Sequence, residues 1–264
     1  MSASPLVHAL AIDCSTDRLS LALAVGQLPL PGAGSWGDCA CLTYEGEGSA
    51  KASTSLVPEA MRLLDQAGLK PTDLSVIVYG RGPGAFTGLR TACAAVQGMA
   101  FGANDRPVLG VDTLMAVAQE ARLRGAPAGS ISALMDARMN EIYAGTYRFD
   151  PALFPASVPE VCSAAALVRP EQAAAAVGAW QTDAPALAGN AMAVYADALS
   201  DLLASATVWP VAPTARAMLH LLPALWATGA ATPADEALPV YVRDQVALTT
   251  AERDALRASQ SQAN

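Results

Sequence analysis

The stretch GRGPGAFTGLR, Gly80–Arg90, follows the apolar run Leu74–Tyr79 and precedes a run of small residues. A glycine-rich turn between a strand and a helix can bind phosphate through its backbone N–H groups. This turn lacks the lysine of a Walker loop and does not match GxGxxG. We therefore predict a rigid elbow in which Gly84 takes a positive φ and Thr87 caps a helix starting at Gly88. The residues assigned to the elbow are Gly82, Pro83, Gly84, Thr87 and Gly88.

The helix after the elbow, predicted over Thr87–Ala103, is apolar on almost every side. One stripe at helical spacing consists of Leu89, Ala92, Cys93, Val96, Met99 and Ala100. The opposite side carries mostly small residues, namely Ala94, Ala95, Gly98, Phe101 and Gly102. One side can face the helix's own sheet. The other side either lies inside the same domain or, because small residues let a helix approach closely, meets another chain.

Strands and helices alternate along the chain, which predicts an α/β fold of two lobes. The first lobe is assigned to residues 1–112. Its strands are expected at Leu6–Ile12, Leu19–Val25, Ala40–Tyr44, Leu74–Tyr79 and Val108–Val111. A helix carries the apolar stripe Leu56, Ala60, Leu63, Leu64 and Ala67. Pro58 fits the first turn of that helix and Gly68 its C-terminal cap.

The second lobe is assigned to residues 113–253. Its strands are expected at Ser130–Met135, Glu141–Arg148 and Ala186–Ala188, and its helices at Thr113–Leu123, Pro170–Trp180, Ala191–Leu203 and Thr214–Thr228. A hairpin turn is expected at Arg138–Asn140. Val240–Arg243 is expected to be a short strand or an extended segment, and this last part of the lobe can pack back on the first. Residues 254–264 are polar and are expected to form a disordered tail.

The composition excludes several classes of protein. The 264 residues carry a net charge of −8, which gives no cationic surface for binding nucleic acid alone. The five cysteines are scattered, which favours free thiols, and the two histidines do not form a metal motif. The N-terminal apolar run is expected to be a strand rather than a signal peptide, and no apolar run is long enough to span a bilayer. We therefore expect a soluble cytoplasmic protein without a metal site.

Two acidic residues at predicted strand ends could belong to a nucleotide site. Asp13 ends the first strand and is followed by the hydroxyls of Ser15 and Thr16, while Asp136 ends a strand of the second lobe. Facing each other across a cleft, the two carboxylates could orient a metal-bound phosphate. Each is also explained without a ligand, as a strand-capping turn and a hairpin turn, and Ser15 stands where a phosphate loop prefers glycine.

Four segments in order along the chain resemble the TsaB (YeaZ) family. They are LAIDCST at Leu10–Thr16, YGRGPGAFTGLR at Tyr79–Arg90, MDARMNEIYAGTY at Met135–Tyr147 and LPVYVRD at Leu238–Asp244. The resemblance implies the two-lobed fold of the actin, sugar-kinase and heat-shock-chaperone ATPase superfamily (ASKHA, ribonuclease H-like), in which each lobe is a mixed sheet with helices.

The resemblance also implies a function. Members of this family are non-catalytic subunits of the bacterial complex that forms N6-threonylcarbamoyladenosine on tRNA, next to the anticodon. In that complex the paralogue TsaD carries the metal and active site, and TsaE is an ATPase partner. The implied TsaD interface comprises Leu56, Ala60, Leu63, Leu64, Ala94, Ala95, Gly98, Phe101 and Gly102.

The same resemblance sets the expectations for ligands. The complex would use ATP, whereas this chain would bind no cofactor tightly. It would reach tRNA only through the complex, and it could form a homodimer when alone. Asp13, Ser15, Thr16 and Asp136 would be a vestigial nucleotide site.

Two other functions stay open at this point. An independent ATP-dependent enzyme of the kinase-like superfamily would need Asp13 and Asp136 to hold a metal-nucleotide. A peptidase has little support, because HExxH, GxSxG and clustered histidines are absent from the sequence.

Overall fold

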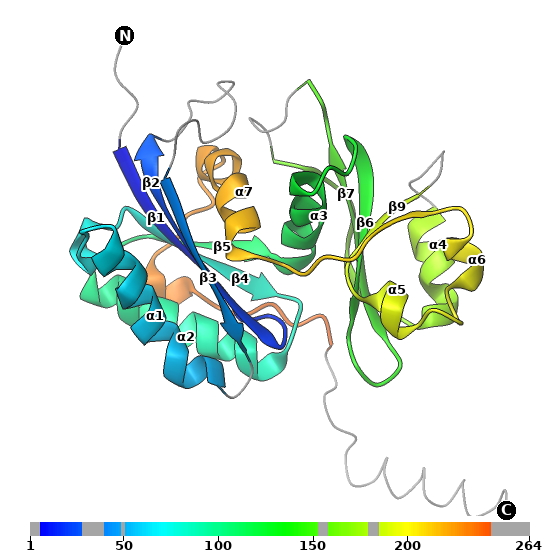
Figure 1. Cartoon of the computed structure of the whole chain (residues 1–264), viewed down its shortest axis with the longest axis horizontal. Coiled ribbons are helices and arrows are strands. Elements are labelled where there is room, and N and C mark those ends of the chain that lie inside the picture. Colours follow the sequence, from blue (N-terminus) through cyan, green and yellow to red (C-terminus); the bar gives the residue numbers. More distant parts are fainter. Residues whose placement is uncertain (1–5, 28–39, 49–50, 153–157, 179–184, 244–264) are drawn as a thin grey trace, which may run out of the picture.

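Two five-stranded sheets with helices on both faces build the molecule (Figure 1). The computed structural model describes residues 6–27, 40–48, 51–152, 158–178 and 185–243. The predicted loop over Gly26–Asp38 lies mostly outside these ranges, and the predicted tail lies outside them completely. Both sheets mix parallel and antiparallel neighbours, which confirms the predicted two-lobed α/β class.

The first sheet has the order β3-β2-β1-β4-β5. β1, β2 and β3 pair antiparallel along the chain, and β4 and β5 add parallel strands. The strands are β1 Leu6–Asp13, β2 Arg18–Gln27, β3 Ala40–Glu47, β4 Val76–Gly82 and β5 Val108–Asp112. Every strand predicted for the first lobe is therefore present, and the parallel strands bring the carboxyl ends of β1 and β4 to the same edge.

The second sheet has the order β10-β9-β6-β7-β8. Its strands are β6 Gly129–Asp136, β7 Ile142–Phe149, β8 Glu160–Val168, β9 Ala186–Ala188 and β10 Thr207–Trp209. β8 and β10 are the two edge strands, and the sequence pattern did not predict either of them. The predicted hairpin between β6 and β7 is confirmed, and its turn residues Arg138, Met139 and Asn140 all have positive φ.

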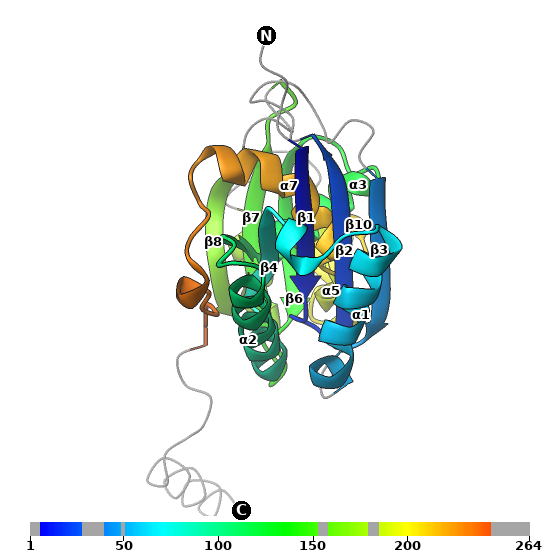
Figure 2. The same ribbon diagram turned by 90° about the vertical axis from the view of Figure 1, so that its left-hand side faces the viewer.

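Helices fill three layers around the two sheets. α1 and α2 cover the outer face of the first sheet and lie side by side (Figure 2), α3 and α7 lie between the sheets, and α4, α5 and α6 cover the outer face of the second sheet. The helices are α1 Ala52–Gln66, α2 Phe86–Gly102, α3 Thr113–Leu123, α4 Ala173–Gly178, α5 Ala191–Val194, α6 Ser200–Leu203 and α7 Ala215–Ala227. Short 3₁₀ turns are η2 Pro71–Asp73, η3 Pro170–Gln172 and η4 Ala234–Glu236.

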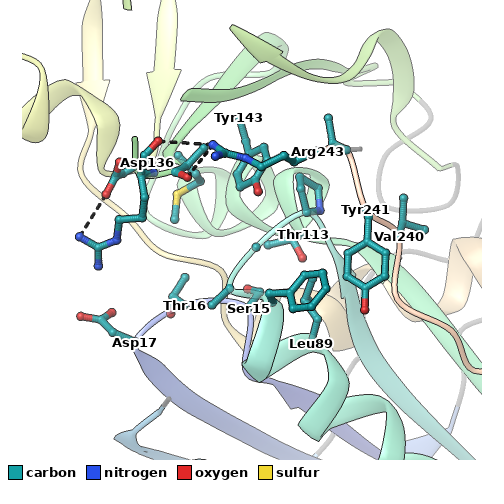
Figure 3. A pocket seen from close by; sticks show the side chains of 18 of the residues that line it. Ser15, Thr16, Asp17, Leu89, Thr113, Asp136, Tyr143, Val240, Tyr241 and Arg243 are labelled. Carbon is teal, nitrogen blue, oxygen red and sulfur yellow. Dashed lines mark hydrogen bonds and ion pairs between the residues drawn. The ribbon is translucent and has the colours of Figure 1, made fainter. Parts of the chain in front are cut away.

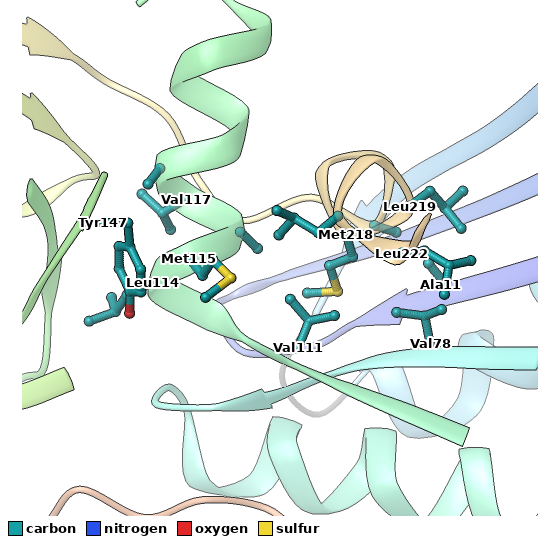
Figure 4. Packing of buried hydrophobic residues seen from close by; sticks show 14 of the residues in the cluster. Ala11, Val78, Val111, Leu114, Met115, Val117, Tyr147, Met218, Leu219 and Leu222 are labelled. Atoms are coloured by element: carbon teal, nitrogen blue, oxygen red, sulfur yellow. The ribbon is translucent and has the colours of Figure 1, made fainter. Parts of the chain in front are cut away.

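The core follows from the period-two alternation of the strands. In β1, Leu10 and Ile12 pack under α1 and α2, whereas Ala9 and Ala11 face the layer between the sheets. Figure 4 shows the latter cluster, where Met115 of α3 and Met218 of α7 meet between the two sheets. Small alanines on this face of β1 leave room for the two helices to pack closely.

Near the end of the chain, elements from the second half of the sequence pack on the first lobe. β5 ends at Asp112, so the predicted boundary there separates the sheets. α7, from the second half of the sequence, nevertheless packs against β1, β2 and β4. Beyond α7 the chain runs along the first lobe, where Val108 and Thr232 form an isolated bridge, and Arg243 at its end contacts the second lobe. Val240–Arg243 is an extended segment rather than a strand.

Candidate functional site: the interlobe cleft and the outer helices

The glycines of the elbow let two backbone segments touch. A Cβ on Gly88 would overlap the carbonyl oxygen of Cys14, and one on Gly84 would overlap that of Ser15. The Ala85 N–H donates to that same Ser15 oxygen over 2.6 Å. The elbow is therefore packed against the loop that follows β1, as expected for a rigid turn rather than an open phosphate loop.

Three details of the elbow and the outer helices differ from the sequence predictions. Gly82, not Gly84, has the positive φ, of 114°. α2 begins two residues before Gly88, and Ala85 precedes it without a side-chain cap, so Thr87 lies inside the helix. Pro58 lies in the interior of α1, which begins at Ala52. The start signal for α2 was wrong because the packing of the elbow against the loop after β1, not a capping side chain, precedes the helix.

A cleft of about 240 Å³ opens between the lobes beside the elbow (Figure 3). The loop after β1 contributes Ser15, Thr16 and Asp17, and the second lobe contributes Asp136 and Tyr143. Pockets that hold nucleotide-sized or drug-sized ligands usually measure roughly 300–1,000 Å³. The cleft is smaller than that range.

Asp13 is not part of the cleft wall. Its side chain is buried, and its Oδ2 accepts hydrogen bonds from the Ser15 N–H (3.3 Å) and hydroxyl (2.9 Å). Its Oδ1 has no hydrogen-bond partner among the described residues. Burial raises the pKa of the Asp13 carboxyl to about 7, and the hydrogen bonds from Ser15 oppose this shift. The predicted pairing of Asp13 with Asp136 across the cleft is therefore not formed.

Asp136 does line the cleft, but its carboxylate already has partners. Oδ1 accepts from the Tyr195 hydroxyl at 2.7 Å and from the Arg138 N–H at 2.9 Å. The Arg138 guanidinium lies 3.5 Å from Oδ2. This is the hairpin-turn arrangement that the sequence offered as the alternative to a ligand site.

The donors of the cleft do not fit a metal-nucleotide. The Asp13 carboxylate is buried away from it, and that of Asp136 is held by Tyr195 and Arg138. Within the described ranges, no three His, Cys, Asp or Glu side chains are close enough to hold a metal ion together. Four of the cysteines fall in these ranges, and all are free thiols, as predicted.

The interlobe cleft also contains residues that sequence reasoning did not select. Tyr241 and Arg243, from the end of the described chain, lie across it. The bulky Phe86 of the elbow packs against the Tyr241 ring, with the ring centroids 4.6 Å apart. The signal was available in LPVYVRD, which the sequence marked as a short strand or extended segment and as part of the family resemblance, without assigning Tyr241 or Arg243 to a site.

The outer helices divide the predicted interface residues into two groups. The residues on α1 are all buried in the core of the first lobe and are therefore not exposed to a partner: Leu56, Ala60, Leu63 and Leu64. On α2 the situation is different, because the following residues are exposed: Ala94, Gly98, Phe101 and Gly102. Ala95 is half-buried and packs against the core.

These exposed residues of α2 have small side chains or none, except for Phe101. A Cβ on Gly98 or Gly102 would meet nothing within 4 Å, and Phe101 is 76% exposed. The neighbouring α1 exposes Val57 at 43%. Both side chains are large, apolar and in contact with water on the outer side of the first lobe.

No helix in the described part of the chain is long and apolar enough to cross a bilayer.

Two mixed sheets, helices between and outside them, and a cleft beside the elbow define a two-lobed α/β protein of the actin-like, ribonuclease H-like class. Residues 47–230 match the family model TsaD, described as tRNA N6-adenosine threonylcarbamoyltransferase. The chain belongs to the TsaB (YeaZ) family within this group.

Two of the three relatives described here cover about nine tenths of this chain. The tRNA threonylcarbamoyladenosine biosynthesis protein TsaB of Escherichia coli is 30% identical over 90% of this chain and 95% of its own length. The TsaB of Haemophilus influenzae is 41% identical, over 33% of this chain and 36% of its own length. The solved structure of YeaZ from Pseudomonas aeruginosa superposes with a TM-score of 0.71 at 31% identity, covering 89% of this chain and 99% of that one.

Proposed function

We propose that this chain is a non-catalytic subunit of the machinery that forms N6-threonylcarbamoyladenosine on tRNA. Its role is to bind and activate TsaD, the subunit that performs the transfer. Support comes first from the relatives, which are named tRNA threonylcarbamoyladenosine biosynthesis proteins. It comes second from the cleft, whose donors do not fit a metal-nucleotide.

The observation that carries the proposal is the exposed side of α2. Leu89, Ala92 and Val96 bind this helix to its own sheet, while Gly98, Phe101 and Gly102 point to solvent. Short side chains allow a partner helix to approach, and the Phe101 ring offers apolar area to bury. The same face would join two copies of the chain when TsaD is missing, so the isolated protein would then be a homodimer.

The remaining members of the assembly follow from the same proposal. TsaE joins as a further subunit, ATP is consumed by the complex, and tRNA is bound by the complex rather than by this chain. The chain itself holds no cofactor tightly. The small cleft and the formal charge of −8 agree with these assignments.

Reconstitution tests the proposal. Purified chain and cognate TsaD should elute together in size-exclusion chromatography with light scattering. Modification of a tRNA transcript by TsaD and TsaE should depend on adding the chain. Separate elution together with full modification in the absence of the chain would contradict the proposal.

The second candidate function is an independent ATP-dependent enzyme, which the position of the cleft at the end of β1 favours. Isothermal titration calorimetry of the isolated chain with ATP and Mg²⁺ separates the two. We expect weak or no binding and no hydrolysis above background. Micromolar binding, with hydrolysis lost in Asp13→Ala, would favour the enzyme.

A further inference from the structure

The segment Ala237–Arg243, named here the strap, runs along the first lobe before it crosses the cleft. Its start is fixed to α2, where the Gln97 side-chain amide donates to the Ala237 carbonyl over 3.1 Å. Its middle is fixed to β4, where the Val240 N–H donates to the Arg81 carbonyl over 2.6 Å. The Val240 carbonyl lies so close to Gly82 that any side chain there would collide with it.

Tyr241 adds a side-chain anchor on the same lobe. Its ring packs on Phe86, and its hydroxyl accepts a hydrogen bond from Arg90 Nε over 2.9 Å. The Arg90 guanidinium also lies 3.9 Å from the centroid of the Phe86 ring. Two rings and a cation therefore attach the strap to the first turns of α2.

Arg243, two residues further on, contacts the other lobe. Its guanidinium donates to the carbonyls of Ala137 (3.1 Å) and Arg138 (3.4 Å) and forms an ion pair with Glu141. The Arg243 side chain is only 15% exposed, so these bonds are partly shielded from water. Such charge-assisted bonds, several to one planar group, are stronger than single exposed ion pairs.

The turn that Arg243 holds is conformationally costly. Arg138, Met139 and Asn140 have φ values of 62°, 55° and 57°. Left-handed backbone is sterically strained for a non-glycine residue. The carbonyls around this turn are held both by Arg243 and by the Ala137–Glu141 backbone hydrogen bond of 2.9 Å.

We propose that the strap, through its contacts with both lobes, holds them together and so sets the width of the interlobe cleft. The first half of the strap is fixed to β4 and α2 of one lobe. Across the opening, Arg243 hydrogen-bonds to the β6–β7 turn of the other lobe (Figure 3). Release of Arg243 removes the contacts between the strap and the β6–β7 turn, and the cleft widens on that side. A partner that binds the Arg243 side chain in place of the β6–β7 turn would widen the cleft in the same way.

Distances between spin labels on the two sides of the opening test this proposal. Thr87→Cys in α2 and Val194→Cys in α5 provide exposed sites, in a background where Cys39 and Cys41 are replaced by serine. Double electron–electron resonance then measures the distance between the two labels in the full chain, for wild type, Arg243→Ala and Arg148→Ala. The control variant loses an ion pair with Glu160 that lies within one lobe.

We expect Arg243→Ala to lengthen and broaden the distance distribution, whereas Arg148→Ala leaves it unchanged. Circular dichroism and a thermal melt establish that each variant is folded. Arg243→Lys keeps the charge but cannot serve Glu141 and both carbonyls together, so it should give an intermediate distribution, and it decides the question if the alanine variant unfolds. A wild-type distribution in Arg243→Ala, or in Arg243→Lys where only that variant folds, would overturn the proposal.

Discussion

At the scale of single residues, two carboxylates at the ends of strands have contrasting environments. Asp13 and Asp136 both end strands as predicted, yet one is buried and the other is held in a turn. Periodicity indicates where a strand ends. It does not indicate which way the terminal side chain points, because that depends on the elbow packing onto the loop after β1.

Asp13→Asn should reveal the cost of the buried carboxyl. Below about pH 4 it is protonated in both states. Burial raises its pKa from 3.8 to about 7, so stability falls as pH rises between these values and the loss is complete above them. Relative to Asp13→Asn, wild type should lose up to about 4 kcal/mol over this window. Urea unfolding of both proteins at pH 5 and pH 8 checks this, and a pH-independent difference would contradict it.

Two glycines of α2 should respond oppositely to the same substitution. Gly88→Ala should destabilise the protein by about 1–3 kcal/mol, since its Cβ overlaps the Cys14 carbonyl. Gly98→Ala should stabilise it by up to about 1 kcal/mol, because the site is open and alanine is the better helix former. Thermal melts of the two variants provide the comparison. Equal shifts would mean that the elbow is not closely packed.

At the scale of elements, strands and helices with a clear apolar period were predictable, and the two edge strands of the second sheet were not. β8 contains EVCSAAALV, whose three consecutive alanines hide the alternation of exposed and covered positions. β10 has three residues and pairs only with β9, so it has no local signal. Both strands form because they pair with a neighbouring strand, and a local sequence pattern does not indicate such tertiary contacts.

One hydroxyl at the start of α7 adds a hydrogen bond to the apolar packing between α3 and α7. The Thr214 hydroxyl donates to buried Glu120 over 2.8 Å and accepts from the Ala217 N–H at the start of α7 over 3.1 Å. Thr214→Val keeps the shape but removes the cap and a partner of the carboxylate, so we expect a loss of about 2 kcal/mol. Thr214→Ser should retain most of the stability. Urea unfolding measures both variants, and an unchanged valine variant would show that this hydroxyl is dispensable.

At the scale of the whole molecule, the architecture separates two surfaces. The cleft is narrow and crossed by the strap, whereas the outer helices expose a broad face on the opposite side of the first sheet. The sequence predicted that one side of α2 could meet another chain. It could not assign the buried stripe of α1 to the core, because a stripe that contacts a sheet and one that contacts a partner have the same spacing.

The isolated chain should not bind tRNA at physiological salt. Its net charge of −8 provides few cations to replace the counterions of the phosphate backbone. A gel shift with purified chain and a tRNA transcript should show free tRNA, while the chain mixed with TsaD and TsaE serves as the positive control. A submicromolar shift by the chain alone would contradict this prediction.

The most direct test of the central claim places a charge on the exposed side of α2. Gly98→Arg has room for its side chain in the monomer, so its melting temperature should not fall. At an interface the same arginine would block close helix approach and bury an unpaired charge. The control is Ser205→Arg, at an exposed position of the second lobe. In size-exclusion chromatography with light scattering, Gly98→Arg should elute apart from cognate TsaD while wild type and Ser205→Arg elute with it. Co-elution of folded Gly98→Arg with TsaD at wild-type stoichiometry would contradict the claim.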